Sequence, residues 1–146
     1  MNAKSRGFTL VEVLLSVTII SMLVGLSLPV YKSFQDRNDL DLTTESIANS
    51  FRRAQVYAGA VNGDSQWGVE VQGSTVTLFK GATFASRDTS YDEVTTIPGN
   101  MAVSGLSEVL FSKLSATPNT TGSVTLTANS NDIRTITINA KGMVSY

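Results

Sequence analysis

The sequence predicts an α+β fold in which one long N-terminal helix packs on an antiparallel β-sheet. Three observations predict it. Residues 13–31 carry no charged side chain, residues 32–58 contain neither Pro nor Gly, and residues 60–146 hold 11 Ser and 13 Thr with little helical periodicity. A chain of 146 residues has room for one ordinary domain and not for a second large core.

The first part of the helix is apolar enough to cross a membrane. The stretch from Phe8 to Leu28 has 21 residues, and as a helix it would be about 31 Å long, the thickness of a bilayer core. Lys4 and Arg6 precede it and Lys32 follows, which weakly favours a cytoplasmic N-terminus. The competing interpretation is a buried core helix.

The second part of the helix is amphipathic. Its apolar stripe has spacings of four, three, four, three and four residues and comprises Leu40, Thr44, Ile47, Phe51, Ala54 and Ala58. Pro29 predicts a bend or an open backbone hydrogen bond between the two parts. Gly59 and Gly63 end the helical region. One helix is therefore expected over residues 8–58, with its second half packed on the rest of the chain.

The remainder predicts antiparallel meanders. The expected strands are Gln66–Gln72, Ser74–Lys80, Glu93–Ile97, Val109–Lys113, Ser123–Ala128, Arg134–Ala140 and Met143–Tyr146. Ser112–Thr121 reads as a polar loop. Trp67 and Tyr57 are expected at the junction of helix and sheet.

Composition argues against catalysis. The chain has no Cys and no His, so it lacks a thiolate nucleophile, disulfides, the usual general base at neutral pH and the commonest transition-metal ligand. No Lys or carboxylate motif replaces them, and we expect neither an enzyme nor a cofactor.

Glu12 interrupts the apolar stretch. A carboxylate near the centre of a bilayer costs about 2.5–3.5 kcal/mol on insertion scales, and less near the interface. Position alone leaves two interpretations equal: Glu12 is a functional residue with a partner, or it marks the interface and the span begins at Val13.

Residues 6–12, RGFTLVE, resemble the type IV prepilin signature: a short basic leader ending in Gly, then Phe, an apolar run, and Glu as the fifth residue after the cut. Pro29 also falls where the helix of pilins usually carries a proline. The resemblance implies cleavage between Gly7 and Phe8 by a prepilin peptidase on the cytoplasmic face, followed by N-methylation of Phe8.

The resemblance also divides the chain. It implies a leader at 1–7, a transmembrane and filament-core helix at 8–31, and a head at 32–146, made of helix 32–58 and sheet 60–146 in the pilin fold. Cleavage leaves 139 residues with nine basic and twelve acidic side chains. In a bundle of such helices, Glu12 and the Phe8 ammonium of a neighbour would pair, because each charge is costly alone in an apolar core. We hypothesise that Glu12 is an assembly residue.

The head shows a thinner resemblance to H-type minor pseudopilins of type II secretion and to fimbrial T-type minor pilins. It rests on FRRAQ at 51–55, WGVEVQGSTVTLFKG at 67–81 and ITINAKGMVSY at 136–146. The implied protein is a structural subunit of a type II secretion pseudopilus or a type IV pilus. It would be anchored once in the bacterial inner membrane, with its head periplasmic or extracellular. The implied partners are the prepilin peptidase, other pilins and an inner-membrane assembly platform.

Three alternatives remain. Gly25-Leu26-Ser27 offers a signal-peptidase site, and the protein would then be secreted without assembling. Arg134 and Lys141, with Arg52 and Arg53, suggest a DNA-binding minor pilin, although ordinary ion pairing is favoured. Asp88, Asp92 and Glu93 suggest a calcium loop, but nothing in their spacing fixes a geometry, and no metal is expected.

Overall fold

The computed structural model describes residues 7–146, and for residues 26–30 it describes the backbone alone. The expectations that rest on Lys4, Arg6 and the side chains of Leu26, Ser27 and Pro29 therefore lie outside the described residues. The chain divides into two units after Gln35, and each is described by itself.

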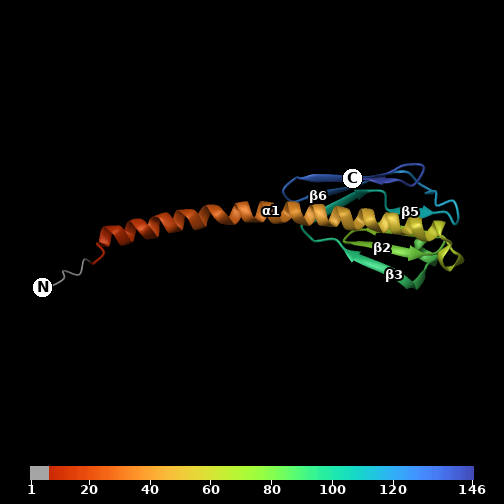
Figure 1. The fold of residues 1–146 in the computed structure, drawn as a ribbon, viewed down its shortest axis with the longest axis horizontal. Helices are drawn as coiled ribbons and strands as arrows, with labels where there is room; N and C mark the ends of the chain where they lie inside the picture. Colours follow the sequence, from red (N-terminus) through yellow and green to blue (C-terminus); the bar gives the residue numbers. More distant parts are fainter. Residues whose placement is uncertain (1–6) are drawn as a thin grey trace. The chain divides into compact units, whose positions relative to one another are not determined.

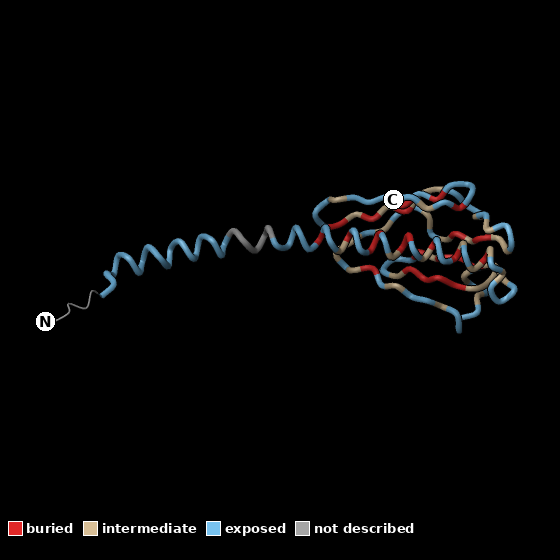
Figure 2. The backbone as a smooth tube through the Cα atoms, viewed as in Figure 1, coloured by how far each residue is buried: buried red, intermediate tan, exposed pale blue. Residues whose placement is uncertain are grey.

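Helix α1 runs over Leu10–Gly59 (Figure 1). It confirms the expected single helix, with each end moved by one or two residues. The helical backbone is continuous through position 29. Every side chain described before residue 26 is exposed, and burial begins at Asp36 (Figure 2).

The predicted stripe of α1 is the side that the head buries. Leu40, Ile47, Phe51, Ala54 and Ala58 have no exposed surface, and Thr44 is 1% exposed. The Thr44 hydroxyl donates to the carbonyl of Leu40 at 2.7 Å, so the one polar member of the stripe is satisfied inside the helix. The 3.6-residue period puts all six on one side.

The head contains two four-stranded sheets, where the sequence led us to expect one. The first has the order β3-β2-β1-β5, and its strands are β1 (Trp67–Gln72), β2 (Thr75–Lys80), β3 (Asp88–Thr96) and β5 (Glu108–Phe111). The second has the order β4-β6-β7-β8, with β4 (Met101–Gly105), β6 (Gly122–Ala128), β7 (Ile133–Ile138) and β8 (Val144–Ser145). Every pairing within the sheets is antiparallel.

Strand register gives each sheet one apolar face. Val69 pairs with Leu78 and Val109 in the first sheet, and Val124 pairs with Ile136 in the second. All five are at most 1% exposed. Because side chains alternate between the faces of a strand, these pairs place their neighbours on the opposite face.

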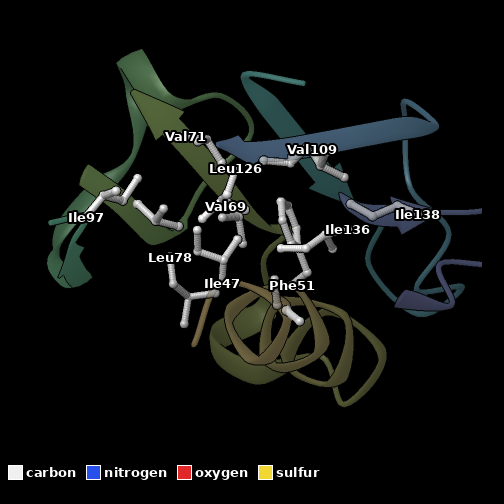
Figure 3. Packing of buried hydrophobic residues seen from close by; sticks show 14 of the residues in the cluster. Ile47, Phe51, Val69, Val71, Leu78, Ile97, Val109, Leu126, Ile136 and Ile138 are labelled. Atoms are coloured by element: carbon white, nitrogen blue, oxygen red, sulfur yellow. The ribbon is translucent and has the colours of Figure 1, made fainter. Parts of the chain in front are cut away.

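One core joins the helix to both sheets. Figure 3 shows Ile47 and Phe51 rising from α1 toward Val69 and Leu78 of the first sheet and Leu126 and Ile136 of the second. The Trp67 and Tyr57 rings meet at the edge of this core, with centroids 4.7 Å apart. Trp67 is 3% exposed, which confirms the expected junction.

Strand β4 was not predicted from the sequence, and some strands begin or end at other residues than expected. β4 is short, and its last residue Gly105 has φ +104. It is a strand because it pairs with β6, some 20 residues away in the chain. No local sequence pattern predicts such a pairing. Strand β3 begins at Asp88, five residues before the expected start, because β2 pairs with this polar stretch at Lys80. The loop expected at residues 112–121 is confirmed apart from one isolated bridge at Pro118.

We predict that Phe51→Ala lowers the free energy of unfolding by about 3–5 kcal/mol, because it leaves a cavity between the helix and both sheets. Denaturant titration followed through the fluorescence of the single tryptophan, Trp67, measures this. Val56→Ala on the same helix is the control, since Val56 is 63% exposed, and it should change stability by less than about 0.5 kcal/mol. A Phe51→Ala loss no larger than that of the control would contradict the shared core.

Candidate functional site

The start of α1 is capped by Thr9. The backbone N–H of Glu12 donates to the Thr9 hydroxyl at 3.3 Å and to its carbonyl at 3.1 Å, and the N–H of Val13 donates to the same carbonyl at 3.2 Å. Thr9 therefore satisfies donors that a helix N-terminus leaves open. Sequence analysis missed this role, although Thr-x-x-Glu is the spacing of a capping box.

The peptide bond between Gly7 and Phe8 lies outside the helix and is open to solvent. Residues 7–9 have no regular secondary structure, and Phe8 is 81% exposed. A Cβ built at Gly7 meets no described atom within 4 Å. The candidate cleavage site thus lies in an exposed segment outside helix and sheet.

Cleavage at this bond would change the balance of charges at the start of α1. Cleavage after Gly7 would create an ammonium at Phe8, next to the positive end of the helix dipole, where a cation is unfavourable. Glu12 lies in the first turn of α1, where a carboxylate is favourable. The Glu12 charge therefore offsets a new cation at Phe8, in the same chain or in a neighbouring one.

Among residues 7–146, the Glu12 carboxylate has no partner. A complete capping box would direct it to the N–H of Thr9, but the hydrogen bonds of Glu12 are made by its backbone alone. The structure thus leaves the carboxylate exposed and available to another molecule.

Three hydroxyls of the first unit are satisfied inside the helix. Ser16, Thr18 and Ser21 each donate to the carbonyl four residues earlier, all at 2.7 Å. Such bonds remove the cost of placing a hydroxyl in apolar surroundings. Among the side chains of α1 described before residue 26, only that of Glu12 is charged.

Large apolar side chains cover all sides of this part of the helix. Their exposed fractions range from 50% to 78%, and they are Leu10, Val11, Val13, Leu14, Leu15, Val17, Ile19, Ile20, Met22, Leu23 and Val24. Contiguous apolar surface of this kind marks a site of contact with apolar partners or lipid. In the described part of the chain, no helix is both long and apolar enough to span a membrane.

A comparison with protein families finds a match in this segment. The model of the prokaryotic N-terminal methylation motif matches residues 2–28. This match supports a type IV pilin-like protein. The observed helix packed on antiparallel sheets is consistent with the pilin fold. No curated protein and no solved structure matches the chain.

The two head cations singled out for DNA contact lie apart. The guanidinium of Arg134 donates to Asp41 of α1 at 2.8 Å. Lys141 lies in the turn after β7, where its carbonyl accepts from Gln55 of α1 at 3.0 Å. Asp41 and Gln55 are about 21 Å apart along the helix axis at 1.5 Å per residue. The structure therefore does not join Arg134 and Lys141 into one patch, and it gives Arg134 an acidic partner.

The acids suggested as calcium ligands have other partners. Asp92 accepts from Arg87 at 2.8 Å, Glu93 accepts from Arg53, and Asp88 accepts from Ser90. In the described part of the chain, no group of three or more His, Cys, Asp or Glu could hold a metal ion.

One acid of the head is placed unfavourably. Glu70 on β1 faces Glu108 on β5, and its Oε2 is buried without a hydrogen-bond partner. Burial, and then the charge of Glu108, raise the pKa of Glu70, against a smaller opposing effect of Arg87. Its other neighbour across the sheet is uncharged, Thr77 on β2.

We predict that a larger residue at Gly7 blocks cleavage without disturbing the fold. A Cβ at position 7 meets no described atom within 4 Å, so a loss of processing in Gly7→Ile is expected to reflect recognition by the peptidase. Mass spectrometry of the full chain is expected to show the seven-residue leader retained in this variant and removed in the wild type. Normal processing of Gly7→Ile would place the cleavage site elsewhere.

We also predict that Glu70→Gln stabilises the head by about 0.5 kcal/mol at pH 7, the scale of a like-charge pair across strands. An acid whose pKa is raised on folding destabilises the native state above that pKa, and the penalty disappears as the pH falls below its ordinary value. The gain should therefore vanish near pH 4. Asp132→Asn is the control of opposite sign, because hydrogen bonds from Arg37 and Ser130 lower the pKa of Asp132. A gain for Glu70→Gln that is independent of pH would contradict this account.

Proposed function

We propose that this chain is a minor pilin or pseudopilin, a structural subunit of a type IV pilus or a type II secretion pseudopilus. The observation that carries the proposal is the N-terminus of α1. It combines an exposed Gly7–Phe8 bond, a capped helix start, an unpartnered carboxylate at Glu12 and apolar side chains on every side. The methylation motif matched over residues 2–28 supports the same conclusion.

In this proposal a prepilin peptidase cuts after Gly7 and the new amine of Phe8 is methylated. Residues 8–31 then lie in the inner membrane until they are extracted into a bundle of similar helices. There the apolar side chains find apolar neighbours, and Glu12 pairs with the Phe8 ammonium of an adjacent subunit. A slip of one subunit would leave both charges without partners in an apolar core, so the pair would set the axial register.

The head in this proposal is a spacer and contact surface and not a catalyst. Its helix and sheets form one apolar core, and its buried polar residues are Asp36, Thr43 and Thr44 of α1 and Thr77 of β2. The DNA-binding alternative receives no support from the placement of Arg134 and Lys141, and it is not proposed here.

Determination of the mature N-terminus separates this proposal from secretion by an ordinary signal peptidase. A methylated Phe8 is expected under the proposal, whereas cleavage after Ser27 would begin the mature chain at Leu28.

We predict that Glu12→Ala is processed at the wild-type rate but loses incorporation into filaments. The reason is that the substitution removes one charge of the pair and leaves the other unpaired in the bundle. The measurement compares the processed chain in the membrane fraction with the chain in sheared or solubilised assemblies. Ser16→Ala, one turn further along α1, is the matched control, because its hydroxyl is already bonded within the helix. Equal incorporation of Glu12→Ala and Ser16→Ala would refute the assembly role of Glu12.

A further inference from the structure

The segment that joins α1 to β1 contains three residues in the left-handed backbone conformation. It includes a single turn of 3₁₀ helix, η1 (Asn62–Asp64). Val61 has φ 56 and ψ 34, Gly63 has φ 65 and ψ 21, and Asp64 has φ 54. Glycine adopts this conformation freely, whereas a β-branched residue such as Val61 rarely does. The segment is therefore held in a strained form, and strain of this kind gathers at sites that have a use for it.

Asn62 and Gly63 form the one Asn-Gly pair among the nine asparagines of the chain. An asparagine is chemically labile because the next backbone nitrogen can attack the carbonyl carbon of its side-chain amide. Glycine in the next position favours this attack most, since it has no side chain to hinder the approach. Both residues are exposed in the folded chain, so water reaches the groups that would react.

Hydrogen bonding leaves the reacting groups of this pair free. The indole N–H of Trp67 donates to the backbone carbonyl of Asn62 at 2.8 Å, and the N–H of Asp64 donates to the carbonyl of Val61 at 3.1 Å. Among the described residues, no partner binds the side-chain amide of Asn62 or the backbone N–H of Gly63. The amide that would be attacked and the nitrogen that would attack it are thus both available.

Other asparagines of the head have their side chains bound. The side chain of Asn139 accepts from two backbone N–H groups at 2.9 and 3.0 Å, and that of Asn119 accepts from one at 2.9 Å. The side chain of Asn100 donates to Asp36 at 2.9 Å. Each of these amides must leave its partner before it can react, so the three serve as internal references for Asn62.

The ammonium group of Lys80 lies beside Gly63. A Cβ placed at Gly63 would be 2.6 Å from both Cε and Nζ of Lys80, so the lysine occupies the space next to the glycine. The same ammonium is 4.2 Å from the centroid of the Tyr91 ring, and it forms no ion pair with a residue that the structure describes. A nearby cation favours loss of a proton from a neighbouring N–H, and it stabilises a carboxylate formed next to it.

We propose that Asn62 is a site of self-modification, at which the folded chain converts a side-chain amide into a carboxylate. The backbone nitrogen of Gly63 gives its proton to solvent and attacks the side-chain carbonyl carbon of Asn62. A new C–N bond forms, and the amide nitrogen takes a proton from water and leaves as ammonia, so that a cyclic succinimide remains. Water then opens the ring at either carbonyl and gives aspartate or isoaspartate. Water is the only other reactant, and nothing is oxidised or reduced.

The modification changes the contact between the end of α1 and Trp67. Both products place a negative charge at position 62, near the unpaired ammonium of Lys80. In isoaspartate the main chain runs through the former side chain, and the carbonyl that accepts from Trp67 becomes part of the free carboxylate. Because the reaction needs only water, the converted fraction rises with the age of the folded chain. This inference does not depend on the proposed function.

Mass spectrometry of the ageing protein tests the site. Full-length protein is kept folded in detergent micelles at neutral pH and, in parallel, unfolded in urea, and its peptides are followed over time. In the folded sample Asn62 is expected to gain about one dalton, several-fold faster than Asn100, Asn119 and Asn139, with fragmentation assigning the gain to the residue. If the folded chain keeps the amide of Asn62 while the unfolded chain loses it, the fold protects this site and the proposal is wrong.

Two variants test the roles of the residues. Asn62→Gln should abolish the gain in its peptide, because attack on the longer side chain requires a larger ring, and a gain that persists would place the modification elsewhere. Lys80→Met should slow the conversion of Asn62 about threefold, the scale of one exposed charge interaction. Lys141→Met, which removes a cation from a turn in another part of the head, is the matched control and should leave the rate unchanged. Trp67 fluorescence shows whether each variant is folded. Equal rates in Lys80→Met and Lys141→Met would overturn the part assigned to Lys80.

Discussion

Burial of one helical stripe under two sheets is the constraint on which the rest of the head depends. Each sheet places the apolar face that carries Val69 or Val124 in the core that it shares with α1. Small residues at the end of the stripe, Ala54 and Ala58, let the chain approach the helix closely, and the loop residue Leu114 donates its N–H to the carbonyl of Ala58 at 3.1 Å. Larger residues in the middle, Ile47 and Phe51, fill the space between the sheets. With one side of the helix committed in this way, the opposite side stays exposed.

Polar contacts fix the second sheet on the helix at both ends. Arg37 and Asp41 of α1 pair with Asp132 and Arg134, which flank the start of β7. At the other end the Gln55 amide donates to the carbonyls of Ala116 and Lys141. Gly142 has φ +80, and a Cβ there would collide with the Gln55 amide.

The basic residues that suggested DNA binding thus lie in a region whose polar groups connect the second sheet to α1. Exposed pairs of this kind add little stability singly, and their contribution here is to orientation.

The sequence predicts the parts of this fold that depend on local patterns. The 4-3-4-3-4 stripe predicts the helix and six of the residues that it buries, although Asp36, Thr43 and Ala48 outside the stripe are buried as well. Alternation in Val69, Val71, Val76 and Leu78 predicts the first hairpin. Strand β4 and the division into two sheets depend on pairing between distant segments, which no local pattern encodes. At the N-terminus, the spacing of Gly7, Phe8 and Glu12 is itself the signal, so the candidate site is found from sequence alone. Whether the Glu12 carboxylate is used within its own helix required the structure, because the Thr9-x-x-Glu12 spacing permits it.

The surface around Glu12 determines how costly its unpaired carboxylate is. In water an exposed glutamate in the first turn of a helix is ordinary, and the helix dipole favours it. Here it is surrounded by apolar side chains that are themselves exposed and by hydroxyls already bonded within the helix. A helix that satisfies its hydroxyls internally is prepared for apolar surroundings, and in such surroundings a lone carboxylate is costly. The segment therefore lowers the cost of burying its hydroxyls in apolar surroundings but retains the cost of burying the Glu12 carboxylate. A second chain that supplies a cation would remove this cost, and cleavage after Gly7 would create such a cation, the amine of Phe8, four residues before Glu12.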